Sequence, residues 1–300
     1  MEKLLFTGGT GFLGANAKPI LDQKYKVTTI GITDRDELKA NFANEVPDLP
    51  CHYDVVLHAA GKAHVYPKTE EEKQAFFDIN YKGTVNLCNA LEKVGVPSTF
   101  VFISTANVYT DDCNDNVTED APLKGESPYA KSKIMAEEYL TKWCKKHGVK
   151  LGILRPSLMA GKKAPGNLGA MVNGIKTGKY LSINHGKAQK SLLMAADIAH
   201  LVPLIESSKE GGVFNVCDSE NPTFGQLEAL IAKQLGKRSP ISIPYWVAKC
   251  LAFIGDMLGD IFPINSKRLD KIVTPDTLNS EKARKELGWV PLRVLDNYEI

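Results

Sequence analysis

Four features that the sequence lacks exclude whole classes of protein. The six cysteines lie far apart and form no C-x-x-C pair, a spacing that argues against a zinc site and against a disulfide-rich scaffold. No stretch reaches the roughly 20 apolar residues that cross a bilayer. The first apolar run, Leu4-Leu5-Phe6, stops at a glycine loop instead of continuing as a signal peptide. The net charge of +2 indicates neither nucleic acid nor an acidic partner. We therefore expect a cytoplasmic protein with no membrane span, no metal site and no nucleic-acid partner.

The segment nearest to a long apolar run lies late in the chain, from Tyr245 to Phe262. Lys249, Asp256 and Asp260 interrupt it. This pattern predicts an amphipathic helix, and we expect that helix to pack on the protein rather than on a membrane surface.

Up to about residue 155, apolar runs of strand length alternate with helical patterns. Strands are expected at residues 4–6, 26–30, 53–58, 100–104 and 149–154, and helices at 12–23, 75–94 and 127–147. Such alternation predicts an α/β fold with a Rossmann-type doubly wound parallel sheet. Later helices are expected at 223–235 and 244–258. We expect a dinucleotide-binding domain over residues 1–155 and a smaller C-terminal α/β lobe, mainly for substrate, over residues 156–300. Later segments are expected to return to the first domain.

Four glycines cluster between the first expected strand and the first expected helix, in the loop Gly8-Gly9-Thr10-Gly11-Phe12-Leu13-Gly14. Glycine permits a tight turn, and the missing side chains let backbone N–H groups approach a pyrophosphate at the helix N-terminus. A simple strand-to-helix turn needs one glycine rather than four. The loop therefore predicts a site for NAD or NADP.

The end of the second expected strand bears on the choice between these two cofactors. An acidic residue about 20 positions beyond the loop holds the ribose in NAD enzymes, but that place falls at Gly31, with Arg35 just beyond. A neutral strand end beside an arginine suits the 2′-phosphate and favours NADP. Asp34 and Asp36 flank the arginine and would serve the ribose of NAD if the loop folds back, so both cofactors stay open.

Tyr129 and Lys133 stand one helical turn apart, on the same face of an expected helix. Tyrosine ordinarily loses its proton near pH 10, and an adjacent ammonium lowers the pKa toward the range of a working acid/base. An expected strand ends upstream at Ser104-Thr105, and parallel strands carry catalytic groups at their C-terminal ends. We therefore expect Thr105, Tyr129 and Lys133 to be the catalytic residues.

The chain resembles the extended short-chain dehydrogenases/reductases, the NAD-dependent epimerase/dehydratase family that includes the UDP-glucose 4-epimerases. The shared blocks run through nearly the whole chain: Thr7 to Gly14; His58-Ala59-Ala60; Asn80 with Gly83-Thr84 and Asn86-Leu87; Ser104-Thr105 with Val108-Tyr109; Tyr129 with Lys133; Arg155-Pro156; and Ala283 with Leu287-Gly288-Trp289 and Pro291. Within the family, the chain is most similar in its general sequence pattern to one branch. This branch contains 4-epimerases and 4-keto reductases of N-acetylated sugars for bacterial surface polysaccharides. That likeness rests on His64, on Asn80 to Thr84 and on the late helix at 244–258.

The resemblance implies a role for each matching position. Tyr129 would be the acid/base at the sugar 4-hydroxyl, Thr105 would share that oxygen, and Lys133 would hold the nicotinamide ribose. The other positions expected to bind the cofactor are Gly8, Gly11, Phe12, Leu13, Gly14, Arg35, Ala59, Ala60, Gly61, Asn80, Ser104 and Pro156. Beside Thr105 and Tyr129, the positions expected to bind substrate are Ser157, Asn167, Leu168 and Lys190.

Two positions depart from the family pattern. Lys190, seven residues ahead of Asp197, replaces an arginine that binds phosphate in relatives and loses its planar, two-pronged contact. Asn41 stands where relatives usually carry an aspartate that contacts adenine. Both departures leave the chemistry intact, and they bear on cofactor and substrate identity.

The expected function is that of an NAD(P)-dependent 4-epimerase or 4-keto reductase of a nucleotide sugar, with a UDP-sugar as the expected substrate. A dehydratase is disfavoured, because Thr105-Ala106 lacks the acidic neighbour that eliminates water in such enzymes. The alternatives are an NADPH-dependent reductase of a small hydrophobic ketone, of the flavonol or steroid type, and a non-catalytic NAD(P)-binding sensor. A homodimer through the helices at 75–94 and 127–147 is a further expectation from the family.

Overall fold

The computed structural model describes residues 1–63, 65–112, 115–258 and 264–300. The expectation on His64, and the last residues of the Tyr245–Phe262 segment, lie outside the described residues. Among the described residues, no helix is long and apolar enough to cross a membrane.

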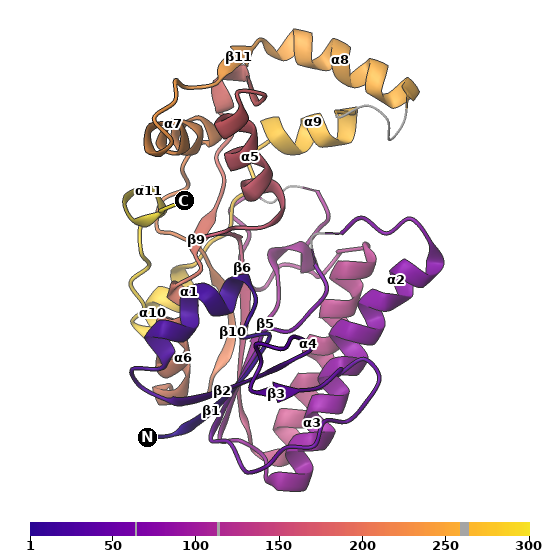
Figure 1. Cartoon of the computed structure of the whole chain (residues 1–300), viewed down its shortest axis with the longest axis vertical. Coiled ribbons are helices and arrows are strands. Elements are labelled where there is room, and N and C mark those ends of the chain that lie inside the picture. The colour runs from indigo at the N-terminus through magenta and orange to yellow at the C-terminus, as the bar shows by residue number, and fades with distance from the viewer. Residues whose placement is uncertain (64, 113–114, 259–263) are drawn as a thin grey trace.

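Seven parallel strands form the central sheet, in the order β10-β6-β5-β4-β1-β2-β3 (Figure 1). Their bounds are β1 (Lys3–Thr7), β2 (Lys26–Gly31), β3 (Leu38–Lys39), β4 (Val55–His58), β5 (Thr99–Ile103), β6 (Lys150–Pro156) and β10 (Gly212–Val216). The inner strands β4 and β5 are buried along their whole length, which explains their continuous apolar sequence. The strand order reverses between β1 and β4, the place where open α/β sheets bind ligands. The predicted doubly wound parallel sheet is confirmed.

Helices cover both faces of this sheet (Figure 1). One face carries α1 (Phe12–Leu21), α6 (Asp197–Ser207) and α10 (Glu281–Leu287), which share a hydrophobic core with β1 and β4. The other face carries α3 (Gly83–Val94) and α4 (Pro128–His147), with α2 (Glu70–Phe76) beside them. The helix predicted at 75–94 is α2, a π-helical turn over Phe77–Lys82 and α3 in direct succession. Such turns are frequent at functional sites.

The second half of the chain supplies a lobe at the carboxyl edge of the sheet (Figure 1). Its helices are α5 (Gly166–Thr177), α7 (Phe224–Gln234), α8 (Tyr245–Leu258), α9 (Ser266–Val273) and α11 (Val294–Asn297). Two small parallel sheets pair β7 (Leu158–Ala160) with β9 (Leu192–Met194) and β8 (Leu181–Ile183) with β11 (Ile241–Ile243). Short strands were expected in this part of the chain as components of an α/β lobe, but their bounds were not predicted, and β3 was not predicted at all. Strand β10 leaves the lobe and pairs with β6, so a late segment completes the large sheet.

Helix α8 packs on the protein, as was expected for the Tyr245–Phe262 segment, but only through small residues. It buries Ala248, Ala252 and Gly255, while Trp246 and Phe253 are 70% and 65% exposed. The large apolar side chains of this helix therefore lie at the surface. The inner face of α8 needs only small residues because it lies close to α9.

Candidate active site

Strand β1 runs into α1 through the glycine loop, where the backbone approaches itself closely. Gly8 has a φ of +72°, and a Cβ there would lie 3.0 Å from the backbone of Ala60. A Cβ on Gly14 would lie 1.8 Å from the carbonyl oxygen of Gly9, so α1 packs directly on the loop. Gly11 caps α1 without any side-chain hydrogen bond from a described residue. The first N–H groups of α1, at Phe12 and beyond, therefore point toward an anion site, as a pyrophosphate requires.

The wall opposite the glycine loop is held by Thr7 at the end of β1. The Thr7 hydroxyl oxygen accepts the N–H groups of Ala59 and Ala60 at 3.1 and 3.0 Å. Because both of its lone pairs are occupied, the hydroxyl donates its own proton to Nδ1 of His58 at 2.7 Å. Nε2 of His58 then carries the proton and donates to the Thr84 hydroxyl at 2.9 Å. These bonds fix Ala59 and Ala60, two of the residues predicted to bind the cofactor.

His58 is held in its neutral form. Burial lowers its pKa to about 3, and the charge of Lys133 adds to the same effect. A neutral imidazole is what the bonds to Thr7 and Thr84 require, since one ring nitrogen accepts and the other donates.

Asn80 lies in the π-helical turn and ties the loop after β4 to α4. Its Nδ2 donates to the Ser132 hydroxyl at 2.9 Å and to the Lys62 carbonyl at 3.1 Å, and its Oδ1 accepts the Lys62 N–H at 2.7 Å. Ser132 donates in turn to the carbonyl of Tyr129 at 2.8 Å. The Asn80 side chain, which was predicted to bind cofactor, therefore also positions the first turn of α4.

The structure brings the three predicted catalytic residues together at the carboxyl edge of the sheet. Thr105 follows β5 and accepts the N–H of Asn107 at 3.2 Å, and its hydroxyl lies near enough to the phenol of Tyr129 to influence the pKa of that group. The ring of Phe76 meets Tyr129 edge-on, with centroids 6.2 Å apart. Burial raises the pKa of Tyr129, and the neighbouring Thr105 hydroxyl acts in the opposite direction. The phenol is therefore protonated at neutral pH.

The ammonium of Lys133 is buried beneath this pair. Its Nζ donates to the carbonyl of Ile103 at 2.8 Å and lies 4.7 Å from the centroid of the Phe102 ring. Burial lowers the pKa of Lys133 to about 8, while the charge of Glu137 acts to raise it. The expectation that Lys133 brings the pKa of Tyr129 below its ordinary value is wrong in this structure, because burial is the larger influence on the phenol. A Cβ on Gly61 would lie 2.9 Å from Asn80 Oδ1 and 3.4 Å from Lys133 Nζ, and the first of these contacts is too close for a side chain unless Asn80 shifts.

A buried polar network lies below the predicted catalytic residues. Arg155 on β6 donates to Glu137 on α4 through Nη2 at 2.6 Å and Nε at 3.2 Å. Its Nη1 donates to the hydroxyl of Tyr109 at 2.9 Å, and that hydroxyl donates to Asn215 on β10 at 2.7 Å. Ser104, predicted to bind cofactor, is 3% exposed and donates its hydroxyl to Glu137. Its side chain is thus committed to the network, and only its backbone is left to face a ligand.

Sequence reasoning missed Glu137. A signal was present, because Tyr129, Lys133 and Glu137 follow one another at four-residue steps and share one face of α4. A carboxylate at such a position is either exposed to solvent or buried and paired with a cation. Glu137 is buried because Arg155, which is distant in the sequence, pairs with it.

The end of β2 holds both an acidic and a basic group. The carboxylate of Asp36 folds back over Gly31, where a Cβ would lie 2.7 Å from its Oδ2. That oxygen accepts the Thr33 N–H at 3.1 Å and the hydroxyls of Thr33 and Thr10 at 2.8 and 3.2 Å. Asp36 Oδ1 is buried without a partner among the described residues. Arg35 is exposed and donates to the carbonyl of Thr10 at 3.1 Å.

These groups fit a nicotinamide dinucleotide. The unsatisfied oxygen of Asp36 suits a ribose hydroxyl, the guanidinium of Arg35 suits a 2′-phosphate, and the uncapped start of α1 suits the pyrophosphate. At the far end, Pro156 closes β6 and is followed by Ser157, whose hydroxyl is buried without a partner among the described residues. A ligand hydroxyl or amide would satisfy it.

The remaining substrate predictions fall in the lobe. Asn167 is exposed in the first turn of α5, whereas Leu168 is 1% exposed in the lobe's core, so only its backbone can face a ligand. Lys190 is buried, and its Nζ donates to the carbonyls of Lys271 and Thr274 at 2.7 and 2.8 Å, at the end of α9. The ammonium group of Lys190, which was expected to bind a substrate phosphate, therefore makes hydrogen bonds within the protein. Its role in binding substrate stays a prediction.

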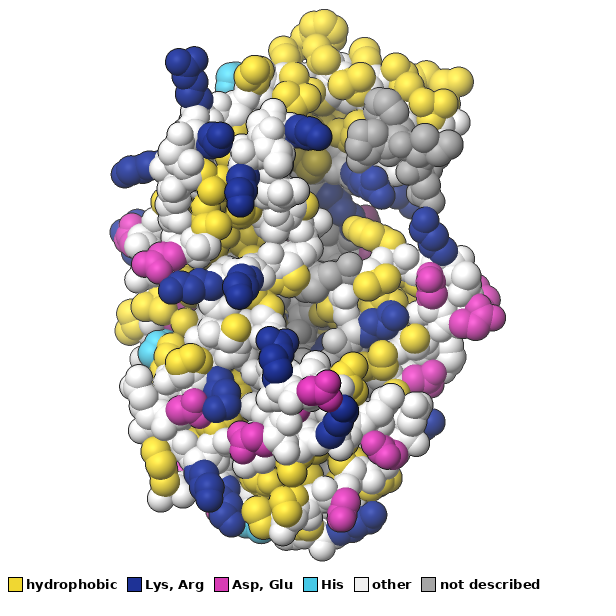
Figure 2. Space-filling model, viewed as in Figure 1, with side chains coloured by type: hydrophobic (Ala, Val, Ile, Leu, Met, Phe, Trp, Pro, Cys, Tyr) yellow, Lys and Arg dark blue, Asp and Glu magenta, His cyan; other side chains and the backbone are white. Residues whose placement is uncertain are grey.

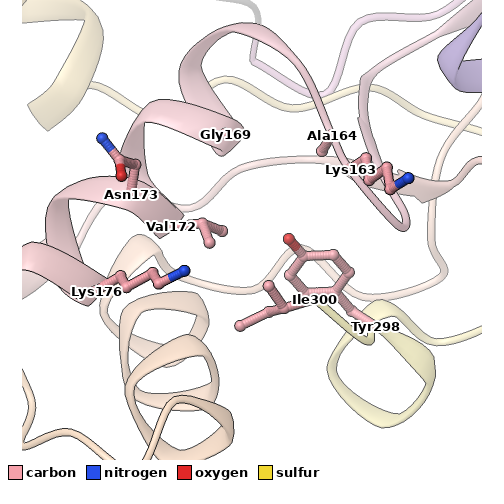
Figure 3. A pocket seen from close by; sticks show the side chains of 8 residues that line it. All are labelled: Lys163, Ala164, Gly169, Val172, Asn173, Lys176, Tyr298 and Ile300. Atoms are coloured by element: carbon pink, nitrogen blue, oxygen red, sulfur yellow. The ribbon is translucent and has the colours of Figure 1, made fainter.

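A cavity of about 240 Å³ lies elsewhere in the lobe, between α5 and the C-terminal segment (Figure 3). Figure 3 shows the ammonium of Lys176 and the hydroxyl of Tyr298 near its centre. None of the three predicted catalytic residues lines it. The cavity is therefore separate from the candidate active site.

Two further expectations concern Asn41 and metals. Asn41 is exposed, and its Oδ1 accepts the N–H of Ala43 at 3.2 Å, so its side chain caps a local turn. Across residues 1–63, 65–112, 115–258 and 264–300, no group of three His, Cys, Asp or Glu side chains is placed to hold a metal ion.

Comparison with known families agrees with this geometry. A family model described as the NAD dependent epimerase/dehydratase family matches residues 4–217, which is more than half of the chain. The chain belongs to this family. It is an NAD(P)-dependent enzyme of the extended short-chain dehydrogenase/reductase type, and the predicted resemblance is confirmed.

Curated relatives in the family include both epimerases and a reductase. An N-acetyl-α-D-glucosaminyl-diphospho-ditrans,octacis-undecaprenol 4-epimerase of Escherichia coli O157:H7 is 25% identical over 96% of this chain and 90% of its own length. A UDP-glucose 4-epimerase of Vibrio cholerae is 26% identical, covering 98% and 92%. A GDP-6-deoxy-D-mannose reductase of Pseudomonas aeruginosa is 27% identical, covering 77% and 79%.

Solved structures share the fold across nearly the whole chain. A UDP-glucose 4-epimerase of Thermotoga maritima with UDP-glucose has a TM-score of 0.72 at 20% identity, covering 96% of this chain and 93% of its own. A Pseudomonas aeruginosa protein in complex with NADPH has a TM-score of 0.74 at 21% identity, covering 99% and 96%.

Proposed function

We propose that the enzyme transfers hydride at C4 of a nucleotide-linked sugar, as a 4-epimerase or a 4-keto reductase, and that its substrate is a UDP-sugar. The observation that carries the proposal is the meeting of Thr105, Tyr129 and Lys133 beside the dinucleotide loop. The names of the relatives support the position of the chemistry, since two of those above are 4-epimerases of diphosphate-linked sugars. The name of the Escherichia coli relative also supports a role in making precursors of surface polysaccharides.

The residues of the chain perform the proton half of this reaction. Oxidation of a secondary alcohol at C4 removes a hydride from carbon and a proton from oxygen, and reduction restores both. When bound, the nicotinamide accepts or supplies the hydride. In the oxidative direction Tyr129, ionised to the phenolate, takes the proton from O4, and in the reductive direction the phenol gives it back. Because burial raises the pKa of Tyr129, its resting form carries the proton that reduction consumes.

Thr105 and Lys133 assist Tyr129 in different ways. The Thr105 hydroxyl lies near enough to the phenol to influence its pKa, so a substrate O4 placed between them would contact both groups. Lys133 contributes positive charge below the site, and this charge favours the phenolate whenever Tyr129 gives up its proton. The pKa of Lys133 is about 8, so the ammonium loses its proton as the pH rises through this value. The pH dependence of turnover near pH 8 therefore shows whether this positive charge is needed.

Product analysis tests the proposal. The purified enzyme is incubated with UDP-glucose and with UDP-N-acetylglucosamine, and the sugars are separated after acid release. An epimerase forms the C4 epimer without net use of cofactor and retains NAD through purification. A reductase leaves these sugars unchanged, binds NADPH, and consumes it only with a UDP-4-keto sugar. If no product forms with any of these sugars and UDP does not alter thermal stability, the proposal is wrong.

The predicted homodimer through α3 and α4 is a separate question, answered by the mass in solution.

A further inference from the structure

Helix α8 presents its large apolar side chains to solvent and its small ones to the protein. Trp246, Phe253 and Met257 follow at steps of seven and four residues, share one side of the helix, and are 70%, 65% and 75% exposed. Ala248 and Ala252, on the opposite side, are fully buried. An ordinary surface helix does the reverse.

This arrangement is fixed by packing, so the outer face is a stable feature of the lobe. The buried alanines join Ile183 and Leu269 in a small hydrophobic cluster with α9 and β8. At the far end of α8, the carboxylate of Asp256 accepts the N–H and the hydroxyl of Ser266, which starts α9. The inner side of α8 is thereby satisfied, and the large outer side chains contribute nothing to the core.

Exposed apolar side chains gather around this helix. Of the fifteen large hydrophobic residues exposed in the described parts of the chain, eight lie on α8 or on the adjoining strands β8 and β11. Two of these, Leu181 and Ile241, are register partners across the β8–β11 pair. Figure 2 shows hydrophobic side chains gathered over the end of the molecule that carries α8, with Lys and Arg side chains nearby. Concentrations of this kind mark interaction sites.

The charge around α8 identifies the kind of partner. Residues 233–274 contain seven Lys and Arg against three Asp, a net charge of +4, whereas the whole chain carries +2. Exposed members of this set lie before β11, on α8 and on α9: Lys237, Arg238, Lys249 and Lys267. A second copy of the chain meeting this face symmetrically would bring like charges together. An anionic lipid surface attracts them, and it accepts Trp and Phe at the headgroup boundary.

We propose that the outer face of α8, centred on Trp246, Phe253 and Met257, docks on the surface of a bilayer that contains anionic lipid. The apolar side chains enter the headgroup boundary, and the neighbouring Lys and Arg side chains contact lipid phosphates. The enzyme is then a peripheral membrane protein whose substrate lobe faces the bilayer. This docking is independent of the proposed reaction at C4.

The three tryptophans of the chain make a direct test possible. Trp143 and Trp289 are 5% and 2% exposed, so only Trp246 is placed to report on the outer face. We expect phosphatidylcholine vesicles that contain phosphatidylglycerol to shift its fluorescence to the blue, and brominated acyl chains to quench it. Trp246→Phe removes both signals. Added salt weakens the binding, because the charge attraction is screened.

Vesicle co-sedimentation with matched variants completes the test. Phe253→Gln with Met257→Gln is expected to lower binding by roughly tenfold or more, since two apolar side chains no longer enter the lipid. Val290→Gln, at a position 84% exposed outside the lobe's apolar face, is expected to bind as the wild type does. Turnover without vesicles should be unchanged in the double variant, so a failure of docking and a failure of the proposed reaction are seen separately. The proposal is overturned if anionic vesicles give no shift at low salt, if the double variant binds undiminished, or if the shift arises without vesicles as the protein doubles its mass.

Discussion

Glu137 and Arg155 form a two-pronged ion pair inside the protein, with Nη2 2.6 Å from Oε2 and Nε 3.2 Å from Oε1. Their side chains are 5% and 6% exposed. Glu137 lies one helical turn after Lys133, and its charge acts to raise the pKa of that ammonium against the effect of burial. The pair therefore links the anchoring of α4 on β6 to the charge beneath the catalytic site.

Replacing Glu137 by Gln should disturb both roles. Removing one partner of a buried pair leaves the other charge uncompensated, so we expect a loss of about 3–5 kcal/mol in the free energy of unfolding. We also expect the pKa of Lys133 to fall further, which moves the alkaline limb of the pH–activity profile to lower pH. Urea unfolding and the pH profile measure the two effects. Replacing both Glu137 and Arg155 by Met should cost less than Glu137→Gln alone, and the reverse order would contradict the account.

Neutral His58 should make the protein sensitive to acid. Its pKa is about 3 in the folded chain, against an ordinary value of 6.5. Between these values the unfolded chain binds a proton that the folded chain does not, so stability present above pH 6.5 is lost as the pH falls toward 3. The loss from this residue alone is on the order of 5 kcal/mol, at 1.36 kcal/mol for each pH unit.

A variant without a titrating ring isolates that contribution. In His58→Gln the side-chain amide can still donate to Thr84, so we expect a folded protein that is less stable at neutral pH. Its stability should fall less steeply between pH 6.5 and 3, as followed by urea unfolding at each pH. An unchanged slope would show that another group controls acid unfolding.

The cofactor preference should depend on Asp36. Its unpartnered Oδ1 suits a ribose hydroxyl, and its negative charge repels a 2′-phosphate. We expect Asp36→Asn to shift the ratio of kcat/KM for NADP over NAD by roughly tenfold toward NADP, and Arg35→Ala to shift it in the opposite direction. Asp34→Asn is the matched control, because Asp34 is exposed and pairs with Lys39. Equal effects of Asp36→Asn and Asp34→Asn would show that only net charge matters.

The parts of the fold and site that sequence could predict are those governed by local spacing. The glycine loop follows from the close approach of α1 to Gly9, which only a missing side chain permits. Tyr129 and Lys133 follow from the period of a helix, and Thr105 from its place at a strand end. The structure brings all three together, although their roles at C4 stay a proposal.

The missed features depend on contacts between segments that are distant in sequence. Nothing near Glu137 indicates that Arg155 will meet it from β6, and the fold-back of Asp36 over Gly31 depends on hydroxyls from two loops. Helix α8 was expected to pack on the protein, but its sequence does not say which of its apolar residues make the contact. The structure shows that the alanines fill the space against α9.

The central claim is that Tyr129 exchanges the proton at O4, and Tyr129→Phe tests it most directly. The variant keeps the ring that meets Phe76 and loses only the hydroxyl. Turnover of the UDP-sugar is expected to fall by roughly 10²–10⁴-fold, while binding of NADH or NADPH, followed by fluorescence, stays close to that of the wild type. Tyr25→Phe, which removes a hydroxyl bonded to Glu206 away from the active site, should leave turnover unchanged. A Tyr129→Phe enzyme with the turnover of the wild type would contradict the account.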